Sequence, residues 1–240
     1  MNAATSRPLK RFYSKATAQS AGTGWSVELD KRPIKTPAGA SLILPSEPLA
    51  KAVAAEWNSQ PETVDIASLH LTRLANVAID RTPLTRADLV DEVARYCETD
   101  LTCFLASETA LRRRQDEAWR PWRDWAGRVH GMVLAPVEGV IAAPQPTDSL
   151  YAARQLAQSY DDFRLTGLAF GCGIFGSAVL SFAVIERALA AGEAFAASVV
   201  DECYQEEQWG QDAEAVAARS SKAAEAEALG VWSLALAENA

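Results

Sequence analysis

Residues 165–185 read LTGLAFGCGIFGSAVLSFAVI, and this stretch decides between a membrane protein and a folded helical domain. Its 21 residues carry no formal charge, and a helix of that length could span a bilayer. Glycines clustered in the middle interrupt the run, however, and Ser177 is well suited to cap a second, shorter helix. Charged residues close both ends. We therefore expect a buried helical hairpin and no membrane span.

The first eighty residues have the pattern of a small β-rich region with one helix. Residues 25–30 alternate between apolar and polar side chains, which is typical of a half-buried strand. The segments 31–33 and 36–39 contain the prolines and glycine expected of turns. Further short strands are expected from Ile34 and over 41–44. The pattern predicts an antiparallel meander.

The helix of this region is expected to follow Ser46. A serine N-cap satisfies free N–H groups of the first turn, and Pro48 fits there because it lacks an N–H. Leu49, Val53 and Trp57 recur at the spacing of one helical face. This spacing predicts that they lie on one apolar stripe.

From about residue 84 the apolar residues recur with a helical period. Thr85 and Asp88 resemble a capping box, with Asp in the usual place of Glu or Gln. Further helices are expected over 111–129 with a break or restart at Pro121, from Thr147, over 192–209, and in the tail from Asp212. The expected fold class is α+β, with a mixed domain over 1–82 and a larger all-α domain over 83–240.

Composition and charge exclude several classes of protein. The 240 residues include 23 Lys and Arg against 31 Asp and Glu, a net charge of −8, which disfavours a general binder of nucleic-acid phosphates. Arginines do surround Trp119, Trp122 and Trp125, but acids lie among them, and we interpret this cluster as core or protein interface. The four cysteines form no C-x-x-C pair and are expected to be reduced, buried thiols. With only two histidines as well, no metal site is expected.

One motif could indicate an enzyme. Gly171, Gly173 and Gly176 match the G-x-G-x-x-G pattern of dinucleotide-binding loops. Such a loop must follow a strand, whereas the residues before it have a helical pattern. Close helix packing is therefore the favoured interpretation, and a nucleotide-cofactor-binding enzyme using this loop is the alternative. The chain contains no G-x-S-x-G elbow and no Walker loop, so we expect no catalytic residue, cofactor or small-molecule substrate.

The strongest charge feature lies near the C-terminus. The segment 193–214 contains seven acids and no base. Within it Glu202 and Glu206 are neighbours on one helical face, and Gln205 and Trp209 lie close to that face. The segment is either a solubilising surface or a negative, aromatic-edged surface for a partner with a basic patch.

Six spaced motifs resemble the assembly-chaperone family of F-type ATP synthases. The resemblance extends over nearly the whole chain, and six motifs in order are more specific than any one of them. A departure is Leu69-His70, where the family tends to have Met-Pro. The motifs are RFY (11–13), LDKRPIKTP (29–37), AEWNSQ (55–60), LTRL with AID (71–80), RY with TDL (95–101) and DECYQ with WG (201–210).

The resemblance implies a non-enzymatic chaperone that holds the α subunit of the catalytic head, shields its β-facing surface and yields it to the β subunit. The partner-binding residues we expect are Glu202, Gln205 and Glu206, with Trp209 as aromatic anchor. Glu56 and Trp57 are a second candidate pair, although the apolar stripe also allows Trp57 to be a core residue. Because the sequence before the first motif is short, we expect the protein in the bacterial cytoplasm rather than in the mitochondrial matrix.

Overall fold

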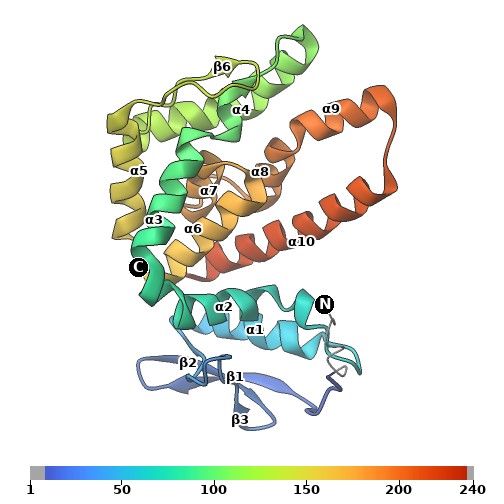
Figure 1. Cartoon of the computed structure of the whole chain (residues 1–240). Coiled ribbons are helices and arrows are strands. Elements are labelled where there is room, and N and C mark those ends of the chain that lie inside the picture. The colour runs from blue at the N-terminus through green and yellow to red at the C-terminus, as the bar shows by residue number, and fades with distance from the viewer. Residues whose placement is uncertain (1–8, 237–240) are drawn as a thin grey trace, which may run out of the picture. The chain divides into compact units, whose positions relative to one another are not determined.

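The computed structural model describes residues 9–236, which divide into two compact units (Figure 1). One unit contains residues 9–80 together with Ala235 and Leu236, and the other contains Arg81–Leu234. The four-stranded sheet lies in the first unit, and the second is mainly helical. The α+β class is thus confirmed. The division into domains 1–82 and 83–240 stays a prediction.

The sheet is built around β2 (Gly24–Leu29). It pairs antiparallel with β1 (Ala16–Ala21) on one side and with β3 (Arg32–Pro33) and β4 (Ile43–Leu44) on the other. The expected meander is present, but it contains a strand that was not expected. The β1 sequence ATAQSA alternates only over its first four residues, and its only apolar residues are alanines, so the pattern was too weak to predict a strand.

The turn after β2 lies at 30–31 rather than at the expected 31–33, and the strand after it begins at Arg32 rather than at Ile34. Leu29 pairs with Arg32, so Asp30 and Lys31 alone form the loop, with φ angles of 47° and 70°. Positive φ at both residues is the geometry of a type I′ hairpin turn. The Asp30 carboxylate accepts hydrogen bonds from the backbone N–H groups of Ser14 (2.7 Å) and Lys15 (2.9 Å). These two bonds are the main reason that the pKa of Asp30 lies below its usual value.

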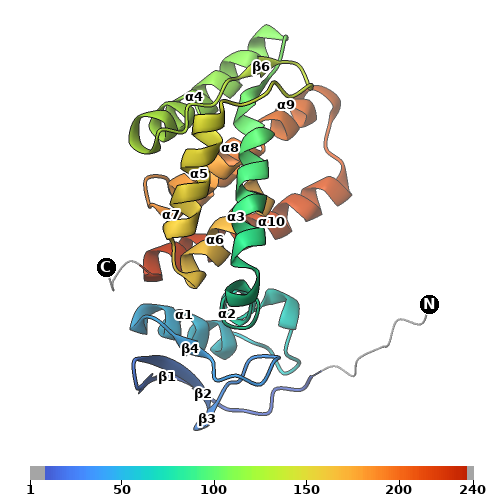
Figure 2. The ribbon, with the colours of Figure 1, turned by 60° about the vertical axis from the view of Figure 1, so that its left-hand side comes forward.

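Helix α1 (Glu47–Asn58) begins as expected. The Ser46 hydroxyl accepts a hydrogen bond from the Leu49 N–H at 3.2 Å, and Pro48 lies in the first turn. Leu49 and Val53 are fully buried, and the helix packs on β1 and β2 (Figure 2).

The prediction of one helix in this unit is wrong. A second helix, α2 (His70–Asp80), follows a short 3₁₀ turn and lies beside α1. Its N-terminus is capped by Glu56 of α1 rather than by a neighbouring residue in the sequence. Its start therefore carried no local signal.

The second unit contains most of the helices. A pair of two-residue strands, β5 (Phe104–Leu105) and β6 (Val137–Glu138), runs parallel beside α4. The hairpin α6–α7 packs against α3, and α5 packs on α3 as well (Figures 1 and 2). The helices are α3 (Thr82–Glu98), α4 (Thr109–His130), α5 (Thr147–Ser159), α6 (Asp162–Phe175), α7 (Ala178–Ile185), α8 (Ala191–Ser198), α9 (Val200–Trp209) and α10 (Ala213–Leu236).

Four details of these helices correct the sequence analysis. Thr85 does not cap a helix: it lies at a kink inside α3, where its hydroxyl bonds the Arg81 carbonyl. Helix α4 continues through Pro121 without a break. Thr147 begins α5 but makes no capping bond, since the N-cap position is Pro146. The helix expected over 192–209 is two helices that meet at Val199.

The predicted hairpin is confirmed. Gly176 ends α6 with a left-handed φ of 62°, and the Ser177 hydroxyl accepts the Leu180 N–H at 3.0 Å to begin α7. A Cβ on Gly167 would lie 2.9 Å from the Trp232 ring, so this glycine permits close packing. Gly171 and Gly173 also lie inside α6, and the element directly before α6 is helix α5 rather than a strand, so the dinucleotide-loop alternative is wrong. No helix in residues 9–236 has the length and apolarity needed to cross a bilayer.

Asp100, in the TDL motif, connects two segments of this unit by hydrogen bonds. It is fully buried, and its carboxylate accepts hydrogen bonds from the Thr102 N–H and hydroxyl, the Ser177 hydroxyl (2.8 Å) and the Val179 N–H (3.0 Å). Burial raises the pKa of Asp100, and these four donors oppose that rise. The carboxylate thereby fixes the start of α7 to the loop after α3.

Candidate partner-binding site

Helix α9 is attached to α4 along one side. The Glu207 carboxylate forms two contacts with the Arg114 guanidinium, Oε1–Nη1 at 2.8 Å and Oε2–Nη2 at 2.7 Å. The same guanidinium lies 5.0 Å from the centre of the Tyr204 ring. One turn earlier, the Gln115 side chain donates to Asp201 at 2.7 Å, and partial burial raises the pKa of Asp201. These contacts orient the helix.

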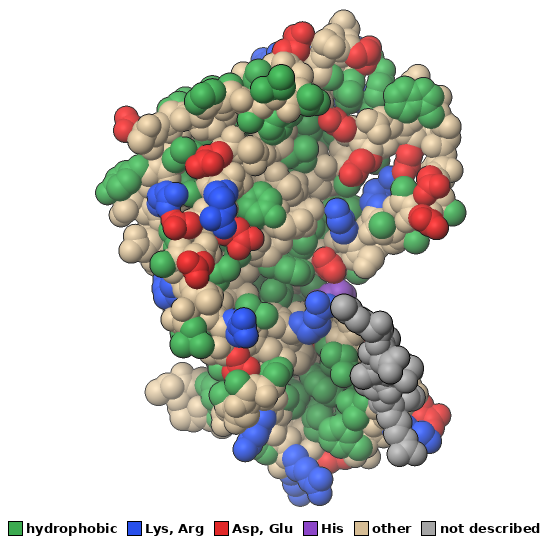
Figure 3. All heavy atoms as spheres, in the orientation of Figure 1, with side chains coloured by type: hydrophobic (Ala, Val, Ile, Leu, Met, Phe, Trp, Pro, Cys, Tyr) green, Lys and Arg blue, Asp and Glu red, His purple; other side chains and the backbone are tan. Residues whose placement is uncertain are grey.

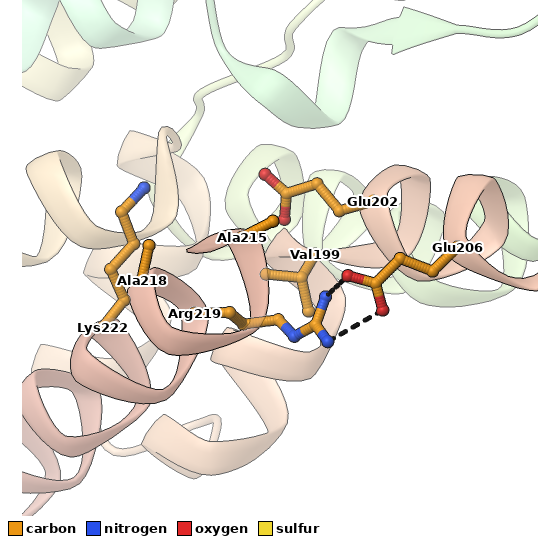
Figure 4. A pocket seen from close by; sticks show the side chains of 7 residues that line it. All are labelled: Val199, Glu202, Glu206, Ala215, Ala218, Arg219 and Lys222. Atoms are coloured by element: carbon orange, nitrogen blue, oxygen red, sulfur yellow. Dashed lines mark hydrogen bonds and ion pairs between the residues drawn. The ribbon is translucent and has the colours of Figure 1, made fainter. Parts of the chain in front are cut away.

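A second ion pair connects α9 with α10. The Glu206 carboxylate faces the Arg219 guanidinium in a two-pronged contact, with Oε2 and Nη2 at 2.8 Å (Figure 4). The hydrogen bonds from Arg219 lower the pKa of Glu206. A groove runs between the two helices beside this pair, and its lining residues are Val199, Glu202, Glu206, Ala215, Ala218, Arg219 and Lys222.

The three remaining candidates on α9 lie on its exposed side. Glu202, Gln205 and Trp209 are separated by three and four residues, so they form one stripe, and all three are exposed. The Trp209 side chain is 79% exposed, which is unusual for a tryptophan. Acidic side chains gather over this region at the right of Figure 3. The structure thus brings the four α9 candidates together. Three of them form the exposed stripe, and Glu206 lies beside it in its ion pair with Arg219.

The acidic segment is less negative than its sequence suggests. Arg114 and Arg219 lie outside 193–214, and each neutralises one acid within it. Asp212 caps α10 by accepting the Ala215 N–H at 2.9 Å. Among the described residues, the acids of this segment without a hydrogen bond or ion pair are Glu193, Glu202 and Glu214. Sequence reasoning missed both arginines, because neither is a helical neighbour of its acid.

The side chains of Glu56 and Trp57 form hydrogen bonds within the first unit. The Glu56 carboxylate accepts hydrogen bonds from the N–H groups of Leu71 (2.8 Å) and Thr72 (2.9 Å) and from the Thr72 hydroxyl (2.7 Å). Trp57 is 8% exposed, as expected of a core residue, and its Nε1 donates to the Thr72 hydroxyl at 3.0 Å. A partner contact by these two residues stays a prediction.

Within residues 9–236 no three His, Cys, Asp or Glu side chains are grouped as metal ligands would be. The four cysteines are free thiols, of which Cys97, Cys103 and Cys172 are buried and Cys203 is half-buried. Burial raises the pKa of Cys103 to about 12, so this thiol stays protonated at neutral pH. Trp119 is fully buried, and its Nε1 donates to the Ala197 carbonyl at 2.7 Å, in agreement with a core role.

Comparison with known proteins shows the family. Residues 10–127 match the model of the ATP12 chaperone protein family. The crystal structure of Atp12 from Paracoccus denitrificans has a TM-score of 0.86 to this chain and is 36% identical, over 95% of this chain and 98% of that one. This chain belongs to the ATP12 chaperone family.

Two further relatives of this ATP12 family member agree with that assignment. A crystal structure from Agrobacterium tumefaciens has a TM-score of 0.88 and 33% identity, over 95% of this chain and 86% of that one. The mitochondrial protein atp12 of Schizosaccharomyces pombe is 25% identical over 84% of this chain and 74% of its own length. This member of the family is therefore an ATP synthase assembly chaperone and not an enzyme.

Proposed function

We propose that this assembly chaperone binds the unassembled α subunit of the F-type ATP synthase, covers the surface that faces the β subunit and releases α to β. A subunit made for a ring exposes a large interface before assembly. Exposed apolar surface of that size promotes aggregation. A chaperone that covers the interface and then yields it to β would prevent association with wrong partners.

The observation that carries this proposal is the exposed stripe of Glu202, Gln205 and Trp209 on α9. Tryptophan is among the residues that supply most of the binding energy in protein interfaces. A carboxylate without an internal partner is available to a basic residue of the client, and complementary charge favours the correct encounter. The stripe is also held in place by the contacts of α9 with Arg114 and Arg219, so little ordering is needed on binding.

The groove between α9 and α10 also supports the proposal that the client binds at this surface. Glu202 belongs both to the exposed stripe and to the groove lining, so a client segment on α9 would also contact the small apolar residues Ala215 and Ala218. In Figure 4 Glu202 lies beside the Glu206–Arg219 pair. The pair is already satisfied, which leaves Glu202 as the acid on this rim for an incoming cation.

Two charge reversals test the proposal. Glu202→Lys should leave the α subunit insoluble on co-expression, because it replaces the free acid of the stripe with a cation. Glu214→Lys makes the same charge change at another unpaired, exposed acid and should rescue α as well as the wild type. Trp209→Ala should weaken binding to isolated α by at least about tenfold. Undiminished rescue by Glu202→Lys and Trp209→Ala, with circular dichroism unchanged, would reject this surface.

We also propose a location in the bacterial cytoplasm. The solved relatives from Paracoccus denitrificans and Agrobacterium tumefaciens support a bacterial protein, whereas the fungal relative is mitochondrial. Binding of nucleic acid or of a small-molecule substrate is not part of the proposal. Thermal stabilisation by NAD or retention on a polyanion column would contradict it.

A further inference from the structure

Strand β1 presents unused backbone groups along its outer edge. Ala21 pairs with Gly24 across a two-residue loop, and such a closing pair exchanges its N–H and C=O bonds. Residues 17, 19 and 21 therefore bond to β2, while Ala16, Ala18 and Ser20 direct their N–H and C=O groups away from it. The Asp30 N–H donates to the Lys15 carbonyl at 3.0 Å, which agrees with this alternation, because Lys15 belongs to the same odd-numbered series.

The first of these outward positions is filled by a side chain that imitates a strand. The Ala16 N–H donates to Asn58 Oδ1 at 2.8 Å, and Asn58 Nδ2 donates to the Ala16 carbonyl at 2.9 Å. These are the two bonds that a residue of an added strand would make. In the described part of the chain, Ala18 and Ser20 form no hydrogen bond on this side. Two consecutive positions for strand pairing thus remain open next to Asn58.

The two edges of the sheet differ in their protection. The opposite edge is formed in part by Arg32 and Pro33, with Lys31 and Lys35 on either side. Proline and lysine or arginine on an edge strand prevent pairing with another chain. The β1 sequence ATAQSA contains none of these. The β1 edge is therefore better suited to accept a strand than the part of the opposite edge formed by β3.

We propose that the outer edge of β1 binds an extended, uncharged segment of the client by β-strand addition. The segment would pair with Ala18 and Ser20 and end where Asn58 begins. Uncharged side chains fit best because β1 offers no charge to pair with across the strands. The client is α only if the function proposed above is correct. A contact of a few hydrogen bonds adds a small binding free energy to that of the α9 surface. It is also weak enough to break readily when the client is released.

A second copy of the chain fits this edge less well. Antiparallel pairing of two β1 strands about Ala18 would place the partner's Ser20 opposite Ala16. The Asn58 amide already fills that position in each copy. Pairing about Gln19 avoids that position and would match Ala18 with Ser20 of the other copy, but each copy carries a net charge of −8, which opposes the association of two copies.

Proline substitutions test the edge directly. Proline at 18 and 20 removes the two outward N–H donors and leaves the bonds of Thr17 and Gln19 to β2 intact. The double variant Ala18→Pro and Ser20→Pro should bind isolated α about tenfold more weakly, as expected for two lost hydrogen bonds. The control variant Ala18→Val with Ser20→Thr keeps both donors and should bind within about twofold of the wild type. Equal binding by the proline variant, with its thermal unfolding unchanged, would overturn the proposal.

Hydrogen exchange of the wild-type chain gives a readout that does not depend on a variant. The Ala18 and Ser20 amides should exchange rapidly in the free protein and become protected in the complex with α, while Gln19 is protected in both. Binding of α without new protection at Ala18 and Ser20 rejects the edge but keeps the proposed function. No binding of α at all rejects the proposed function and with it the client named here. Protection in the free protein that rises with its concentration would identify a second copy as the occupant and overturn the proposal.

Discussion

Replacing Glu56 with alanine should destabilise the first unit without affecting the α9 surface. The substitution removes the acceptor for the Leu71 and Thr72 N–H groups, which lie in the first turn of α2. Loss of a helix N-cap costs about 1–2 kcal/mol. The lost bond from the Thr72 hydroxyl adds about 1 kcal/mol. We therefore expect Glu56→Ala to lower the free energy of unfolding by about 2–3 kcal/mol, a large fraction of the total for a small domain.

Urea denaturation followed by circular dichroism measures this loss. Glu62→Ala is the matched control, because it removes an exposed acid whose side chain forms no hydrogen bond or ion pair in the described structure, and it should change the free energy by less than about 0.5 kcal/mol. Under conditions where it remains folded, Glu56→Ala should still bind α. A free energy of unfolding equal to that of the control, together with loss of α binding, would show that Glu56 is a contact residue and that the reasoning is wrong.

Three further predictions concern the fold. Asp100→Ala leaves four buried donors without an acceptor and should lower the free energy of unfolding by about 3–5 kcal/mol in urea titrations, so a loss below about 1 kcal/mol would contradict its role. The lowered pKa of Asp30 stabilises the fold above the unfolded-state pKa near 4, and this contribution disappears as the pH falls through the lower folded-state pKa. The stability difference between wild type and Asp30→Asn should thus be full at pH 6 and become smaller as the pH is lowered below 4, and a constant difference would refute it. Gly167→Ala collides with Trp232 and should cost about 1–3 kcal/mol, whereas Gly173→Ala has open space and should gain about 0.5–1 kcal/mol, and melting temperatures that move in the same direction would count against this packing.

Local signals in the sequence predicted the parts of the fold that depend on neighbouring residues. Ser46 and Pro48 correctly predicted the start of α1, and Gly176 and Ser177 correctly predicted the division of the apolar run into two helices. These signals could be read from the sequence because helix caps act over three or four residues. The apolar stripe correctly placed Leu49 and Val53 in the core. The same rule failed at Thr85, whose hydroxyl bonds a backbone carbonyl of the preceding turn instead of capping a helix.

Contacts between distant residues could not be predicted in this way. The cap of α2 comes from Glu56, fifteen residues before Leu71, and the start of α7 is held by Asp100. The charge of the acidic segment was overestimated because Arg114 and Arg219 pair with it from other helices. The motifs that indicated the family include Asp30, Glu56 and Asp100, and each of these carboxylates binds backbone N–H groups within the chain. At these three residues the resemblance therefore reflects the fold.

The most direct test of the central claim is a binding experiment with purified components. The chain is mixed with isolated α subunit and analysed by size-exclusion chromatography, and β subunit is then added to the mixture. We expect the chain and α to elute together, and β to take α into a complex from which the chain is absent. Separate elution of the chain and α, or a complex that β leaves intact, would contradict the claim that this chaperone holds α for β.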